Sequence, residues 1–83
     1  MKFSKQGRAF EELQKIGAPV MIRDGEMIIS AEQNDDEMWA NYYAPGAYGL
    51  DDFGVSEKIN KILQARGLFA EWMNPGCLGV FEA

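Results

Sequence analysis

The sequence predicts an α+β domain in which an antiparallel sheet of about five strands carries two helices on one face. Two amphipathic segments with helical spacing, and Asp-Gly and Pro-Gly pairs that each separate two β-prone runs, predict this class. The elements are expected in the order α-β-β-β-α-β-β. Alternating β-α-β units are absent, so a parallel sheet is not expected. A chain of 83 residues is expected to form a single domain over residues 1–83.

The first helix is predicted from Ser4, a candidate N-cap, to about Ile16. Gly17 then supplies a residue that favours the left-handed conformation at a helix end. The apolar stripe that predicts this helix consists of Phe3, Ala9, Phe10, Leu13 and Ile16.

A β-hairpin is predicted next, with strands over residues 19–23 and 26–30. The Asp24-Gly25 pair between them favours a tight turn in which both residues take positive φ. One side of this hairpin is expected to lie under the helices. A third strand is expected over residues 38–43, where alternate residues place bulky side chains on both faces.

The remaining chain predicts a long loop, a helix and a second hairpin. Pro45 and several glycines indicate a loop over residues 44–54. The second helix is expected to open at Ser56 and close before Gly67, with Ile59, Ile62 and Leu63 as its buried stripe. Strands over 69–73 and 77–81 flank Asn74-Pro75-Gly76, where Pro followed by Gly suits a type II turn.

Charge is strongly segregated along the chain. Between Asp24 and Glu57 there are nine carboxylates and no Lys or Arg, whereas the segments before and after carry +3 and +1, so the formal net charge is −5. The same stretch holds five of the ten aromatic residues, which are Trp39, Tyr42, Tyr43, Tyr48 and Phe53. Such segregation shapes the electrostatic field and the choice of partner more than it shapes the fold.

Two interpretations of this acidic and aromatic stretch stay open. In the first it is a docking face for a basic protein surface, with charge steering association and aromatic side chains supplying contact area. In the second it is a solvated loop whose aromatic residues belong to the core. The docking interpretation requires the carboxylates to gather on one exposed face, and its candidate partner-binding residues are Asp35, Asp36, Glu37, Tyr43, Tyr48, Asp51 and Asp52.

Catalytic and metal chemistry is not expected. The chain has no His, and Cys77 has no neighbouring His to activate it, so this cysteine is expected to be a small buried residue. The polar run at 34–37 lacks the alternating oxygen ligands and tight Gly of a calcium loop. We expect no catalytic residue, no cofactor and no metal.

Composition also bears on nucleic acids and on the compartment. The eight Lys and Arg residues are scattered through the two flanks, which disfavours direct binding of nucleic acid. No apolar run approaches the roughly 20 residues of a membrane span, and no apolar leader pattern follows Met1. With its single cysteine, the chain is expected to be cytoplasmic.

Three segments carry a resemblance to a known group of proteins. They are Trp39-Ala40-Asn41-Tyr42-Tyr43, a helix ending Ala65-Arg66-Gly67, and Glu71-Trp72-Met73-Asn74-Pro75-Gly76-Cys77-Leu78-Gly79-Val80-Phe81. Over residues 39–82 the chain resembles small proteins of unknown function carried by phages, prophages and plasmids. The resemblance implies no catalytic residues. It implies a mobile-element context, in which small acidic anti-CRISPR or anti-restriction proteins imitate the charge of DNA.

The first predicted helix is basic, which departs from a uniformly acidic mimic and favours a single acidic face. We therefore expect a non-catalytic acidic inhibitor that docks on a basic surface of a nucleic-acid-handling complex. The alternative is a structural or adaptor module that forms a homodimer through an exposed strand edge, burying Trp39 and Tyr42.

Overall fold

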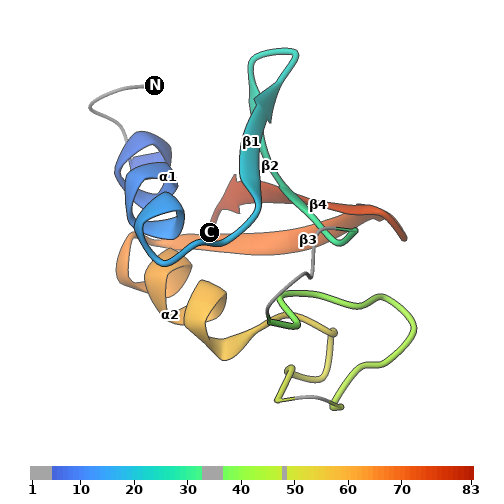
Figure 1. Cartoon of the computed structure of the whole chain (residues 1–83). Coiled ribbons are helices and arrows are strands. Elements are labelled where there is room, and N and C mark those ends of the chain that lie inside the picture. The colour runs from blue at the N-terminus through green and yellow to red at the C-terminus, as the bar shows by residue number, and fades with distance from the viewer. Residues whose placement is uncertain (1–4, 33–36, 48) are drawn as a thin grey trace.

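Two helices and one four-stranded antiparallel sheet make up the part of the chain that the computed structural model describes, namely residues 5–32, 37–47 and 49–83. The α+β class is therefore confirmed. The strands lie in the order β1-β2-β4-β3, so β1 and β3 form the edges of the sheet. The elements are α1 (Lys5–Lys15), β1 (Val20–Arg23), β2 (Glu26–Ser30), α2 (Glu57–Ala65), β3 (Leu68–Asn74) and β4 (Cys77–Glu82) (Figure 1).

Both helices pack against the same face of the sheet, side by side (Figure 1). Their buried residues join one core cluster with strand residues that lie opposite one another in register, such as Ile29 and Leu78. Because side chains alternate along a strand, such pairs point to one face. The main members of this cluster are Ala9 and Leu13 of α1, Ile59 and Leu63 of α2, and Met27, Ile29, Leu68, Leu78 and Val80 of the strands.

The ends of the helices follow from local sequence. After α1, Gly17 takes a φ of 86° and its N–H donates to the Gln14 carbonyl, while the Ala18 N–H donates to that of Leu13. This pattern is a Schellman motif, which satisfies carbonyls that the helix leaves unpaired. The predicted end of the first helix is thus confirmed within one residue, whereas the predicted cap at Ser4 lies outside the described residues.

The second helix also begins and ends where the sequence indicated. The Ser56 hydroxyl accepts a hydrogen bond from the Lys58 N–H at 3.2 Å, which makes Ser56 its N-cap. Beyond its last turn, Gly67 takes a φ of 69°. A salt bridge of 2.6 Å between Arg66 and Glu12 joins this end of α2 to α1. Neither described helix is long and apolar enough to cross a membrane.

The first hairpin is confirmed and the second differs in its turn. Asp24 and Gly25 have φ values of 53° and 78°, as a tight two-residue turn requires. Gly76 does not take positive φ, so the predicted type II turn is wrong. The Asn74 side chain instead accepts a hydrogen bond from the Gly76 N–H at 2.8 Å, and an irregularity between Trp72 and Asn74 absorbs the change in register.

The predicted third strand over residues 38–43 is wrong, and the described residues form a sheet of four strands rather than about five. Only Ala40 forms a bridge there, to Val55. The Asn41 side chain ends the extended run, because its Oδ1 accepts a hydrogen bond from the Tyr43 N–H at 2.9 Å and the backbone turns at Tyr42. Residues 38–43, whose side chains alternate as in a strand, thus form an irregular segment that leads into the predicted loop.

Candidate functional site

Residues 37–56, which the structure describes except at residue 48 and which we call the connecting segment, lead into α2 and extend beyond the end of the sheet (Figure 1). Its base is fixed in the core, where Trp39 and Ala40 are buried. The Asn41 N–H donates to the Gly54 carbonyl and the Ser56 N–H donates to the Trp39 carbonyl, both at 2.8 Å. These bonds hold the two ends of the segment together, so its tip is a closed loop.

Three large aromatic side chains of this segment are exposed. Tyr43 and Phe53 expose 78% and 74% of their surface, and Tyr42 exposes 47%. The Tyr42 ring lies edge-on to the rings of Tyr43 and of Trp72 in β3, with centroids 5.3 Å apart in each pair. The Trp72 indole N–H donates to the Phe53 carbonyl at 2.6 Å. We call these four residues the aromatic surface.

Asp51 organises the tip of the connecting segment. One carboxylate oxygen accepts hydrogen bonds from the Phe53 and Val55 N–H groups at 2.8 and 3.0 Å. The other accepts from the Asn60 side chain of α2 at 2.7 Å. The Asp51 carbonyl in turn accepts from the Gly46 and Gly54 N–H groups. The carboxylate therefore fixes the loop to the helix, and this internal role positions Phe53.

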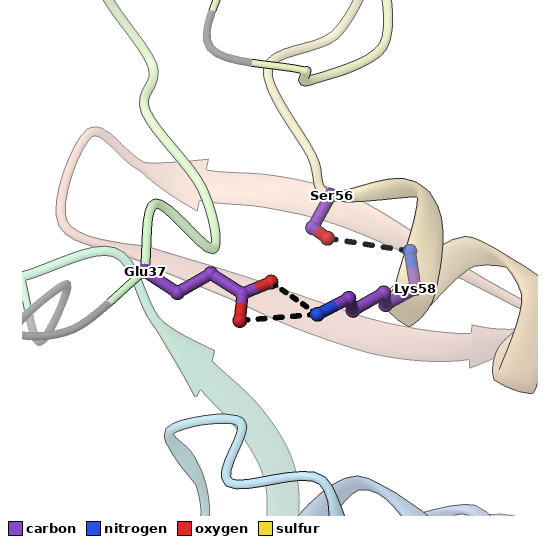
Figure 2. Close-up of polar contacts among 3 residues, drawn as sticks. All are labelled: Glu37, Ser56 and Lys58. Carbon is purple, nitrogen blue, oxygen red and sulfur yellow. Dashed lines mark hydrogen bonds and ion pairs between the residues drawn. The ribbon is translucent and has the colours of Figure 1, made fainter.

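Glu37 is paired rather than free. Its carboxylate forms a salt bridge of 2.9 Å with the Lys58 ammonium (Figure 2). The same ammonium lies 5.7 Å from the centre of the Trp39 ring, within range of a cation–π contact. Lys58 follows the N-cap Ser56, so the capped first turn of α2 places the cation (Figure 2). Part of the charge in the connecting segment is thereby neutralised locally.

The candidate residues from the sequence divide into three groups. Tyr43 and Asp52 are exposed, as a docking role requires. Glu37 and Asp51 are held by the contacts described above. The remaining candidates, Asp35, Asp36 and Tyr48, lie outside the described residues.

Among the described residues, the carboxylates of the acidic stretch do not all lie on one face. Asp24 lies in the turn between β1 and β2 and Glu26 follows it, and this turn is at the opposite end of the molecule from the connecting segment (Figure 1). The expectation of a single acidic face therefore fails for these two residues. Among the described residues, Asp52 is an exposed carboxylate next to Phe53 in the chain, and Glu71 is one next to Trp72.

A groove of about 430 Å³ lies next to the aromatic surface. It is bounded by the tip of the connecting segment, by α2 and by β3, and its lining is mainly apolar. Its lining residues are Asp51, Phe53, Val55, Asn60, Leu63, Gln64, Leu68, Phe69, Ala70, Glu71 and Trp72. No pattern in the sequence indicates this groove, because β3 and the connecting segment meet only in the folded chain.

No group of three or more His, Cys, Asp or Glu side chains that could hold a metal ion occurs among the described residues. Cys77 is buried with a free thiol, in agreement with its prediction as a small core residue. The comparisons of the chain with protein-family models, with curated proteins and with solved structures gave no match.

Proposed function

We propose that the protein is a non-catalytic binding protein whose connecting segment docks on a basic surface of a protein partner, of the kind that handles nucleic acids. One observation carries the proposal: Tyr43 and Phe53 each expose about three quarters of their surface on a loop that internal hydrogen bonds hold in place. Exposed aromatic side chains on a fixed scaffold supply most of the affinity in many protein interfaces.

The charge of the segment supports a basic partner. From Asp24 to Glu57 the chain has no Lys or Arg, and the exposed Asp52 adjoins the exposed Phe53. Carboxylates beside an aromatic contact steer a cationic surface toward it and repel nucleic acid itself. A surface that normally binds DNA or RNA has the required positive charge. The protein would then act as an inhibitor by occupying that surface, in the manner of anti-restriction or anti-CRISPR proteins.

The proposal is tested by capture on the immobilised protein of purified nucleases, restriction enzymes and CRISPR surveillance complexes at rising salt. We expect retention of one such complex to weaken as salt rises from about 0.1 to 0.5 M, because screening shortens the Debye length from about 10 to about 4 Å. Replacing both Tyr43 and Phe53 by serine is expected to weaken binding by at least about tenfold. Asp52→Asn is expected to slow association a few-fold.

Glu11→Gln is the matched control, since it removes an exposed carboxylate of α1 and is expected to leave binding unchanged. Retention that is indifferent both to salt and to the Tyr43 and Phe53 changes would overturn the proposal.

Self-association through a strand edge is a second candidate, and one observation favours it: β3 has no strand on its outer side among the described residues. Trp39 is already buried within the single chain, so a dimer contact could not depend on it as the sequence suggested. Sedimentation velocity separates the candidates, because the docking proposal expects a monomer and the second candidate a dimer.

A further inference from the structure

The outer edge of β3 carries backbone groups in a defined pattern, and among the described residues no strand pairs with them. The Ala83 N–H donates to the Gly67 carbonyl at 2.9 Å, so Gly67 faces β4. Backbone groups alternate between the two sides along an antiparallel strand, and Leu68, Ala70 and Trp72 therefore direct their N–H and C=O groups away from β4. An exposed row of such groups is a template for pairing with a further strand.

The groove described above lies along this same edge. Its floor is formed by Val55, Leu63 and Leu68, and Ala70 contributes only a methyl group beside them. Phe53 and Trp72, which are joined by the hydrogen bond from the Trp72 indole N–H, also line the groove. A strand added to β3 would place every second side chain over this apolar floor, because side chains alternate in direction along a strand.

The charge of the groove lining indicates which kind of partner strand would bind to β3. Among the residues that the structure describes, the charged ones that line the groove are Asp51 and Glu71, and no Lys or Arg lines it. Glu71 alternates with Ala70, so it points to the opposite face of the sheet from the groove floor. A Lys or Arg on the added strand, at a position between two apolar residues, would lie across from Glu71. Opposite charges in such cross-strand pairs are favourable.

We propose that the β3 edge and its groove bind an extended segment of a partner protein in which apolar residues alternate with Lys or Arg. This inference rests on the proposed function for the basic character of the partner, and it adds the mode of binding and the recognised sequence pattern. Such strand addition combines backbone hydrogen bonds for affinity with side-chain pockets for specificity.

A second copy of the chain fits the same edge less well. Antiparallel pairing of two β3 strands about Ala70 would place Glu71 of each copy opposite Phe69 of the other, which leaves both carboxylates without a cation. It would also bring together two chains of formal charge −5 and the Asp51 carboxylates of both grooves. A basic segment removes these repulsions.

The test uses a blocked eight-residue peptide of alternating valine and lysine, titrated into the ¹⁵N-labelled protein at low salt. We expect chemical-shift changes confined to residues 53–55 and 68–73 and to the Trp72 indole N–H. A valine–glutamate peptide, and the valine–lysine peptide with alternate backbone amides methylated, are expected to bind at least about tenfold more weakly.

Two variants and one control sharpen the result. Ala70→Phe fills the groove and Ala70→Pro removes one outward N–H, and each is expected to weaken peptide binding at least about fivefold. Ile22→Pro is the matched control: Pro19 accepts a hydrogen bond from the Ser30 N–H, so alternation directs the Ile22 N–H away from β2 at the opposite edge. Spectra of each variant verify that it is folded, and Glu71→Gln, which changes no backbone group, provides a further test should Ala70→Pro unfold.

The inference is overturned if the shifts map to the β1 edge, if the valine–glutamate peptide binds equally well, if no peptide binds, or if Ala70→Phe and Glu71→Gln both bind as before. If the chemical shifts of the protein without peptide change with its concentration, the β3 edge binds a second copy of the chain. That result would also overturn the inference. If the protein still captures its partner through Tyr43 and Phe53 but does not bind the peptide, only the inference of strand addition is contradicted. Loss of capture with peptide binding intact contradicts the proposed function instead.

Discussion

Gly54→Ala is expected to lower the free energy of unfolding by roughly 3 kcal/mol or more, as two costs combine. Gly54 takes a φ of 85°, a left-handed conformation that costs an alanine about 1–2 kcal/mol. In addition, a Cβ on Gly54 would overlap the backbone carbonyl oxygen of Asn41. The backbone cannot rotate aside as a flexible side chain does. The two backbone segments would have to move apart, which would lengthen or break the hydrogen bond from the Asn41 N–H to the Gly54 carbonyl.

Gly46→Ala is the matched control for this experiment. Gly46 has a similar φ of 78°, but an added Cβ would meet nothing within 4 Å. We therefore expect only the conformational cost of about 1–2 kcal/mol. Urea unfolding of both variants measures the difference, and equal losses of stability would show that the contact between Gly54 and Asn41 does not hold the connecting segment closed.

Asp51→Ala is expected to cost about 2–3 kcal/mol, because it leaves three donors without their acceptor. These are the N–H groups of Phe53 and Val55 and the side-chain amide of Asn60, and Val55 is buried. A buried donor that loses its acceptor has given up its hydrogen bond to water and has no hydrogen bond in the protein to offset that loss. Besides the lower stability, we expect the Trp72 indole resonance to shift, since Asp51 positions the loop that supplies its Phe53 acceptor.

Asp52→Ala removes the same kind of side chain one residue further on and is expected to change stability by no more than about 0.5 kcal/mol, because Asp52 is exposed. A double-mutant cycle of Asp51→Ala with Asn60→Ala isolates the bond between the loop and α2. Equal stability of the Asp51 and Asp52 variants, or no coupling between Asp51 and Asn60, would contradict the organising role of Asp51.

The elements that local sequence signals specify were predictable. Asp24-Gly25 favours its turn through backbone conformation alone, and Ser56 and Gly67 mark the ends of α2 through groups within one turn. The prediction of a third strand is wrong because the side chains of residues 38–43 alternate as in a strand, whereas the Asn41 side chain accepts a hydrogen bond from the Tyr43 N–H and the chain turns. Alternation alone does not reveal that competition.

The candidate site was less predictable, because tertiary contacts separate residues that look alike in the sequence. Asp51 and Asp52 are adjacent and identical in type, yet one bonds to Val55 and Asn60 and the other faces solvent. Trp72 joined the aromatic surface only because β3 passes beside the connecting segment. Phe53 is one of the aromatic residues of the acidic stretch, but no local pattern in the sequence indicates its exposure.

Docking by the connecting segment is tested most directly by an amide chemical-shift map of the ¹⁵N-labelled protein in complex with the partner retained in the capture experiment. If the connecting segment is the docking surface, we expect the largest changes at Tyr42, Tyr43, Asp52 and Phe53, with little change along α1 or in the β1–β2 turn. Changes concentrated on α1 or on that turn, with Tyr43 and Phe53 unaffected, would contradict it.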